Sequence, residues 1–298
     1  MKILCTFPGK IGDLLWALPS LRAIAESLEG TPVDLVVGAP YGRICALITK
    51  QTYVRQAIAY ESWPVQDTAP MSPREPDPAV HYGYDHVFHL GYRGWPAFPL
   101  PYETYDCLRA QWPADWPSLR PLDLSRPWIT SSARLAAPPQ VALGWTDEWF
   151  ELKVGLTALL LLQAPDQSQL VNVSWSPRWQ HEWWEQSWGH RVEAEFALGD
   201  WVKVAGILSQ VKVFCGDCSA LHVLACAVGT PVVVMEPNPH RHHEVFYPSG
   251  TGGVVRLVRG MDGLPTFDAR HTWDVIQEIL KETDHEDRGI TTETPRTR

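Results

Sequence analysis

Strand and helix patterns alternate along this chain in two blocks, and this alternation limits its possible folds more strongly than any other feature. In the first block we predict strands at 2–7, 33–37, 54–60 and 84–90 and helices at 13–28 and 41–48. In the second block we predict strands at 170–175, 191–196, 211–215 and 232–235 and helices at 147–162, 181–187, 200–208, 219–227 and 274–281. The alternation is typical of α/β proteins, in which right-handed β–α–β units build a parallel sheet.

A proline-rich stretch of low periodicity, residues 113–140, separates the two blocks. The 298 residues are enough for two domains of ordinary size. We therefore predict an N-terminal Rossmann-like domain over residues 1–150 and a C-terminal Rossmann-like domain over 151–285, facing each other across a cleft. The polar residues 286–298 are predicted to be a disordered tail. Pro19 interrupts the first helical pattern and predicts a kink or a restart there.

Composition and charge argue against several classes of protein. The longest apolar run, residues 156–162, is shorter than the roughly 18 residues of a membrane span. Residues 1–6 already have a strand pattern, so we expect no signal peptide and a cytoplasmic protein. The six cysteines are too few and too scattered for a disulfide framework. The net charge of −9 argues against nonspecific coating of nucleic acid, which needs clustered basic residues.

The first predicted strand runs through the turn Pro8-Gly-Lys-Ile-Gly-Asp13 directly into a helix. Asp13 is thereby placed at the carboxyl end of the strand. In open α/β sheets this edge is where ligands bind. Asp13 is therefore a candidate functional residue.

A second signal follows the strand at 211–215, which ends in Gly216-Asp217-Cys218-Ser219-Ala220-Leu-His222. We predict that Asp217 or Cys218 caps the helix that begins there. Free backbone amides at Ser219 and Ala220, together with the helix dipole, would favour a diphosphate at the cap. His222 would face the same ligand if it lies on the cleft side. The alternatives are a purely structural N-cap at Asp217 and a purely structural His222.

Three segments together resemble the ADP-heptose heptosyltransferases and their relatives among the GT-B glycosyltransferases. The first is Ile11-Gly12-Asp13 followed by Leu-Pro-Ser-Leu-Arg-Ala at 18–23. The second is Val173-Ser-Trp-Ser-Pro-Arg178-Trp179, which we take to open the second domain. The third is the segment 216–222 followed by residues 225–234 and Glu236-Pro237. The three segments stand in the order and spacing of the family.

The resemblance implies a GT-B fold and an inverting, metal-independent glycosyltransferase without a cofactor. Such an enzyme moves a sugar from a UDP- or ADP-linked donor to an acceptor hydroxyl. By the resemblance, Asp13 is the general base that takes the proton of that hydroxyl. Arg178 would bind the departing diphosphate together with Asp217, Cys218, Ser219, Ala220 and His222. A solvent-exposed Arg178 that stacks on Trp179 is the alternative.

Two proline-rich stretches, 61–80 and 91–101, interrupt the first block, and loops of this length inside a domain are usually functional or disordered. The second stretch contains Tyr92, Arg93 and Trp95, which we assign with Lys10 and Gly12 to acceptor binding. A mobile surface loop and a solvated Lys10 are the alternatives.

The sequence also departs from the family. The family has two strand–helix units between the segments of Arg178 and Asp217, whereas only one is predicted here, so we expect one unit to be missing. In addition, Ser219 stands where the family usually has glycine.

Other patterns suggest other chemistry. Cys215-Gly-Asp-Cys218 stands between a strand and a helix, as a thioredoxin-like redox pair would. His240-Arg-His242-His243-Glu244 would suit a metal site, but no second ligand group of matching spacing accompanies it, and we assign no metal. A non-catalytic nucleotide- or sugar-binding protein is the remaining alternative.

The acceptor stays open between two classes. The resemblance favours a cell-envelope saccharide. The alternative is a 5-hydroxymethyl pyrimidine in DNA, as for phage DNA glycosyltransferases, with a flipped base received by the first domain. Residues 1–140 hold 12 basic and 13 acidic side chains, so the net negative charge lies in the second half and does not exclude a polyanion on the first.

Overall fold

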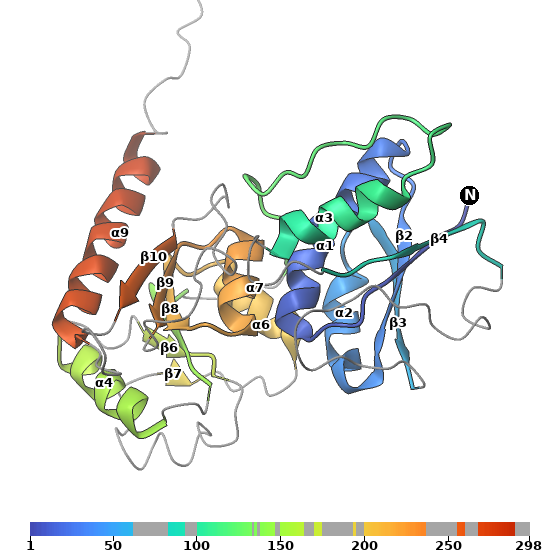
Figure 1. Ribbon diagram of the computed structural model, residues 1–298. Helices are drawn as coiled ribbons and strands as arrows, with labels where there is room; N and C mark the ends of the chain where they lie inside the picture. The colour runs from blue at the N-terminus through green and yellow to red at the C-terminus, as the bar shows by residue number, and fades with distance from the viewer. Residues whose placement is uncertain are drawn as a thin grey trace, which may run out of the picture.

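Two parallel β-sheets with helices packed on them make up the protein, shown in Figure 1 as a computed structural model. The structure describes residues 1–61, 83–92, 100–132, 134–135, 138–146, 150–163, 170–174, 193–194, 200–236, 255–259 and 268–289. In this part of the chain, no helix is both long enough and apolar enough to cross a membrane.

The first sheet has the strand order β3-β2-β1-β4, and every pairing is parallel. Its strands are β1 (Ile3–Thr6), β2 (Val33–Gly38), β3 (Val54–Tyr60) and β4 (His86–His89). Its helices are α1 (Ile11–Ser27), α2 (Cys45–Ile48), which follows a 3₁₀ helix (Ala39–Ile44), and α3 (Leu100–Gln111). The strand order reverses between β1 and β4. The carboxyl ends of these two strands therefore border the crevice in which such sheets bind ligands.

The second sheet has the order β10-β9-β8-β5-β6-β7 and is also parallel throughout. Its strands are β5 (Val141–Gly144), β6 (Leu170–Asn172), β7 (Glu193–Ala194), β8 (Val213–Asp217), β9 (Val232–Glu236) and β10 (Val255–Arg259). Its helices are α4 (Phe150–Gln163), α6 (Trp201–Leu208), α7 (Ala220–Val228) and α9 (Ala269–Gly289). Here the strand order reverses between β5 and β8.

The helices form layers around and between the sheets. Helices α1 and α7 pack against each other between the two sheets, and α4 and α9 lie together on the far face of the second sheet (Figure 1). Strand β5 shows why both faces are covered, because Ala142 belongs to the core between the sheets whereas Val141 and Leu143 belong to the core under α4 and α9. A strand buried on both faces needs apolar residues at successive positions, as this strand has.

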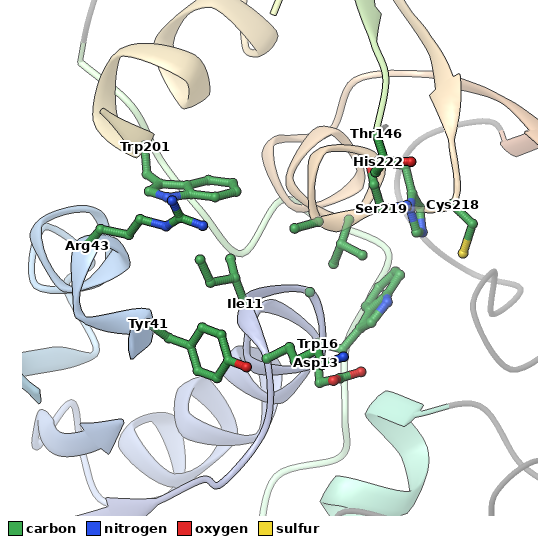
Figure 2. Close-up of a pocket in the computed structure, with 14 residues that line it drawn as sticks. Ile11, Asp13, Trp16, Tyr41, Arg43, Thr146, Trp201, Cys218, Ser219 and His222 are labelled. Atoms are coloured by element: carbon green, nitrogen blue, oxygen red, sulfur yellow. The ribbon is translucent and has the colours of Figure 1, made fainter. Parts of the chain in front are cut away.

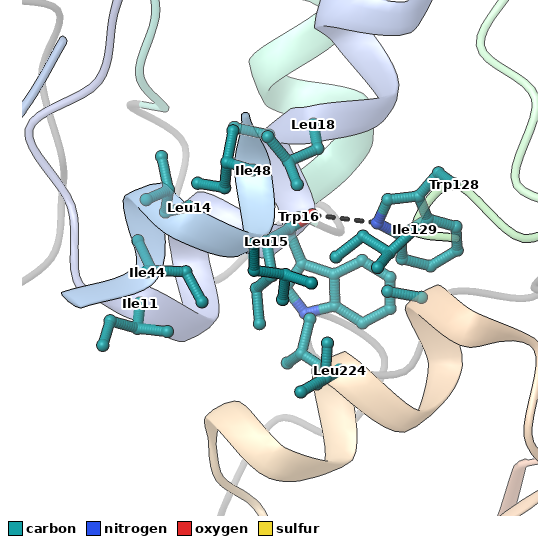
Figure 3. Close-up of a cluster of buried hydrophobic side chains, with 14 of the residues drawn as sticks. Ile11, Leu14, Leu15, Trp16, Leu18, Ile44, Ile48, Trp128, Ile129 and Leu224 are labelled. Carbon is teal, nitrogen blue, oxygen red and sulfur yellow. Dashed lines mark hydrogen bonds between the residues drawn. The ribbon is translucent and has the colours of Figure 1, made fainter. Parts of the chain in front are cut away.

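Pro19 lies inside α1, which continues through it to Ser27. Because proline has no N–H, it cannot donate to the Leu15 carbonyl four residues earlier. The indole Nε1 of Trp128 donates to that carbonyl at 3.0 Å, as the dashed line in Figure 3 shows. The backbone N–H groups of Trp128 and Ile129 donate to the Ala227 carbonyl of α7 at 2.9 and 3.0 Å. The segment around Trp128 thus ties α1 to α7. Of the two alternatives predicted at Pro19, the restart does not occur, because α1 is continuous there, and the kink stays a prediction.

The parallel α/β architecture is confirmed, and most of the predicted elements are present within a few residues of their expected bounds. Helix α3 and strands β5 and β10 were not predicted. Strand β5 lies in the second sheet although it precedes residue 150, where the first domain was expected to end. Helix α9 continues to Gly289, so residues 286–289 are helical rather than part of a disordered tail.

Between the segments of Arg178 and Asp217, the described residues hold the strand β7 and the helix α6 before β8, so the expectation that one strand–helix unit is missing there is not contradicted and stays a prediction. Strand β5 opens the second sheet, and both β6 and β7 follow it before β8. The segment 173–179 therefore follows the second strand of this sheet rather than opening it. The predicted helix at 181–187 and most of the stretch 61–80 lie outside the described residues.

Candidate functional site

A cavity of about 300 Å³ lies between α1 and α7, where the two halves of the chain meet (Figure 2). The N-terminal half lines it with Lys10, Ile11, Gly12, Asp13, Trp16, Tyr41 and Arg43. The C-terminal half lines it with Thr146, Trp201, Cys218, Ser219, Ala220, His222 and Val223. The volume falls at the lower end of the range typical of small-ligand sites. Of the predicted site residues, Lys10, Gly12, Asp13, Cys218, Ser219, Ala220 and His222 come together here.

Asp13 stands in the first turn of α1, directly after the carboxyl end of β1, and is partly buried. Burial raises the pKa of its carboxyl group from the usual 3.8 to about 6. The backbone N–H and the ammonium of Lys10 and the hydroxyl of Tyr92 oppose this rise, because they stabilise the ionised form. A carboxylate with this pKa is ionised at neutral pH and accepts a proton more readily than an ordinary aspartate.

Tyr92 follows β4 and so stands on the other side of the same crevice. Its side chain is 3% exposed and hydrogen-bonds to Asp13. Burial raises the pKa of the Tyr92 phenol far above its usual range, so the hydroxyl stays protonated and donates to the carboxylate. Tyr92 was assigned to acceptor binding, whereas in the structure it holds Asp13. It does not line the cavity.

The N-terminal ends of α1 and α7 meet at the cavity. A β-carbon added to Gly12 in α1 would lie 3.5 Å from the Cα atom of Ala220 in α7. Each helix N-terminus carries partial positive charge from its aligned peptide dipoles. Lys10 and Arg43 add two cationic side chains to the lining. The arrangement suits an anionic ligand, because two helix N-termini and two cations face one cavity.

Helix α7 begins differently from the prediction. Its N-cap is Ser219, whose side chain accepts from the Leu221 N–H at 3.3 Å. The Ser219 N–H donates to Nδ1 of His222 at 2.9 Å, which completes a capping box. The prediction that the Ser219 amide is free to bind a diphosphate is therefore wrong. Of the two predicted amides, only the Ala220 N–H has no partner among the described residues. Because Nδ1 of His222 is an acceptor, its Nε2 carries the proton in the neutral ring.

Asp217 is not a helix cap, and neither is Cys218. The Oδ2 atom of Asp217 accepts from the backbone N–H of Thr146 at 3.0 Å and also from the Thr146 hydroxyl. It forms an ion pair with Lys153 of α4, whose side chain is 1% exposed. The carboxylate therefore lies behind the cavity wall and does not line it. Its burial requires the lysine, since an unpaired buried charge is strongly unfavourable.

Several lining residues were not predicted from the sequence. Tyr41 and Arg43 stand in the 3₁₀ helix that follows the carboxyl end of β2, so the rule that placed Asp13 could also have found them. Figure 2 shows the side chain of Arg43 extending toward the indole of Trp201. Trp16 and Trp201 are both almost fully buried and make the cavity partly aromatic. A flat amphipathic ring of this kind suits a sugar or a base.

The redox alternative is not supported. Cys215 is fully buried, with its Sγ atom 3.9 Å from the sulfur of Met235, and burial raises its pKa above the usual range. A catalytic thiol needs a lowered pKa and access to solvent. Cys215 and Cys218 are both free thiols.

Four of the predicted functional positions fall outside the described residues. They are Arg178, Arg93, Trp95 and the residues 240–244. Among the described residues there is no cluster of His, Cys, Asp and Glu that could hold a metal ion.

Comparison with known proteins decides the fold. No family model matches the chain, and no curated protein sequence matches it either. Among solved structures, E. coli heptosyltransferase WaaC with ADP superposes with a TM-score of 0.61 at 14% identity, over 94% of this chain and 100% of that one. The chain has the GT-B fold in its heptosyltransferase-like form.

Two further structures agree. E. coli ADP-heptose LPS heptosyltransferase II matches with a TM-score of 0.61 at 13% identity, over 95% of this chain and 100% of that one. A family 9 glycosyltransferase from Veillonella parvula DSM 2008 matches with a TM-score of 0.60 at 11% identity, over 94% and 97% of the two chains. The predicted GT-B resemblance is thereby confirmed for the fold.

Proposed function

We propose that this GT-B protein is an inverting glycosyltransferase that uses a nucleotide-diphosphate sugar as donor. The observation that carries the proposal is the position of Asp13, a carboxylate with a pKa raised to about 6, in a cavity bordered by two helix N-termini. A base and a set of anion-binding groups that line one cavity are the two parts that such a transfer needs.

The reaction follows from this arrangement. Asp13 accepts the proton of an acceptor hydroxyl while the hydroxyl oxygen bonds to the anomeric carbon of the donor sugar. The bond from that carbon to the diphosphate oxygen breaks on the opposite face, and the electron pair leaves with the diphosphate. The N-termini of α1 and α7 and the side chains of Lys10 and Arg43 stabilise the developing negative charge. These groups can balance the negative charge of the leaving diphosphate without a metal ion. That the reaction uses neither a metal ion nor a cofactor stays a prediction.

The donor and acceptor are proposed from the neighbours. The solved structures of heptosyltransferase WaaC contain ADP and ADP-2-deoxy-2-fluoro heptose, which makes an ADP-linked sugar the first donor to test and a UDP-linked sugar the second. We take a cell-envelope saccharide as the acceptor. A hydroxymethylated pyrimidine in DNA is the alternative. The free state of all six cysteines supports a reducing compartment such as the cytoplasm.

The proposal is tested in two steps. Thermal-shift measurements with ADP, UDP and their sugars should show stabilisation by one nucleotide, as expected for a ligand that binds only the folded protein. Incubation with the preferred donor and either a lipopolysaccharide core or hydroxymethylcytosine DNA should then identify the acceptor, and NMR of the product should show an inverted anomeric centre.

The variant Asp13→Ala should lose transfer while keeping nucleotide affinity, because the base lies on the acceptor side. The matched control Asp274→Ala, an exposed carboxylate on α9, should keep both. Transfer by Asp13→Ala at the wild-type rate would refute the mechanism. A protein that binds nucleotide sugars but transfers nothing to any hydroxyl would instead be the non-catalytic binding protein.

A further inference from the structure

The ion pair between Lys153 and Asp217 occupies a special place in the second sheet. Asp217 ends β8 and Thr146 follows β5, and these neighbouring parallel strands are in register at Gly144 and Gly216. The strand order reverses between them, so their carboxyl ends border the ligand crevice of this sheet. Thr146 lines the cavity. The Asp217 carboxylate thus lies one hydrogen bond behind the part of the cavity wall that Thr146 forms.

Lys153 is an unusual residue for its position. It lies on the buried face of α4, which continues with Leu156, Leu160 and Leu161, and its side chain is 1% exposed. It also stands in the first described turn of the helix, where the helix dipole disfavours a cation. An apolar side chain of similar length would fit the rest of this face. A buried ion pair is weak evidence for stability, because desolvation offsets the attraction.

The contacts of the pair show what it does for the wall. Lys153 Nζ donates to the Thr146 hydroxyl at 3.0 Å and to its carbonyl at 3.2 Å, in addition to Asp217. The other carboxylate oxygen, Asp217 Oδ1, is buried and makes no hydrogen bond within the described part of the chain. Without the lysine, the buried Asp217 carboxylate would therefore have no counter-charge directly behind Thr146.

We propose that Lys153 is a positioning residue for the donor, which cancels the charge of Asp217 so that the wall formed by Thr146, Cys218 and the N-terminus of α7 accepts an anionic diphosphate. The proposal rests on the proposed function, since it takes the ligand of this wall to be a nucleoside diphosphate. Asp217 keeps its own role, which is to hold Thr146 at the end of β5 through two hydrogen bonds. The pair is thus electrically neutral toward the ligand, and its two members act differently, because Lys153 cancels the charge whereas Asp217 accepts the hydrogen bonds of Thr146.

The test measures ADP and UDP affinity by calorimetry in Lys153→Met, Asp217→Asn and the double variant. Lys153→Met should bind the nucleotide roughly five- to tenfold more weakly, because it leaves a like charge close to the diphosphate. Asp217→Asn should bind at least as tightly as the wild type, and the double variant should return close to the wild type. If Lys153→Met does not fold, Asp217→Asn and the double variant still test the proposal, because both should match or exceed wild-type affinity.

A purely structural pair gives a different pattern, in which both single variants lose affinity together, and that result would overturn the inference. Arg55→Met is the matched control, since Arg55 pairs with the buried Asp34 in the first sheet and lines no part of the cavity. It should leave nucleotide affinity unchanged. Failure of the wild type to bind any nucleoside diphosphate would overturn the proposed function, and this inference with it. Binding by the wild type with the structural pattern in the variants overturns this inference alone.

Discussion

Replacing Asp13 with asparagine should make the folded protein more stable at neutral pH while it removes the proposed base. The pKa of Asp13 is about 6 in the folded protein, above the usual 3.8. Between these values the folded state binds more protons than the unfolded state, so the free energy of unfolding falls as pH rises from about 4 to about 6. The loss is complete about one pH unit above 6, where the carboxylate is ionised despite the cost of its burial.

The size of the effect follows from the shift. At about 1.4 kcal/mol per pKa unit, the rise to about 6 corresponds to at most about 3 kcal/mol. Asp13 is only partly buried, so solvent screening reduces this, and we expect roughly 1–2 kcal/mol. For a chain of this size the melting temperature should rise by several degrees, at about 2–4 °C per kcal/mol.

The assay is urea unfolding of the wild type and Asp13→Asn at pH 4, 5, 6 and 7.5. The difference between the two proteins isolates Asp13, because all other titrating groups are common to both. The gain in stability should be largest at pH 7.5 and should shrink toward zero at pH 4. Asp274→Asn, an exposed control on α9, should show no such trend. A variant that is less stable than the wild type by the same amount at every pH would refute the reasoning.

Three further changes have defined outcomes. Tyr92→Phe removes a hydrogen-bond donor to the Asp13 carboxylate and should raise the pKa of Asp13 further. The acid limb of the pH profile of kcat/KM, expected near pH 6, should therefore move to higher pH, and a shift to lower pH would contradict the hydrogen bond. Gly216→Ala should lower the free energy of unfolding in urea by about 3 kcal/mol or more, because the added β-carbon would lie 2.2 Å from the carbonyl oxygen of Gly144 in β5. Gly155→Ala should instead stabilise α4 by about 0.5–1 kcal/mol, because no atom lies within 4 Å of its added β-carbon. Trp128→Phe should cost about 1–3 kcal/mol in the same assay by leaving a buried α1 carbonyl without its donor, and an unchanged midpoint would argue against that role.

The sequence was most informative where local chemistry and strand position agree. Asp13 could be placed because the turn after β1 fixes it at a sheet edge, and the parallel sheets could be expected from the alternation. The sequence does not predict helix α3 because Pro101 ends a proline-rich stretch that is typical of a loop, although proline is tolerated in the first turn of a helix. Strand β5 was missed because its four residues follow a long proline-rich stretch.

The role of Lys153 could not be predicted from the sequence. A lysine in a helix normally has its ammonium in solvent, and only the position of Asp217, 64 residues later in the chain, shows why this one is buried. In the same way, the predicted N-cap of α7, Asp217 or Cys218, is wrong because Asp217, Cys218 and Ser219 are successive candidates and the structure has Ser219. Which of them caps the helix is decided by the partner that Asp217 finds on another element.

The hydrogen bond from Trp128 to α1 has a consequence for how this sequence can vary. Pro19 creates the unpaired carbonyl, and Trp128 supplies the donor for it from the segment between the sheets. If residue 19 regained an N–H, that group would compete with the indole for the Leu15 carbonyl, and if residue 128 lost its indole, the carbonyl would be left buried and unpaired. Either single change is unfavourable, so the two positions should be exchanged together. Positions 19 and 128 should therefore emerge as a covarying pair once sequences of this kind are aligned, although neither residue takes part in the proposed chemistry.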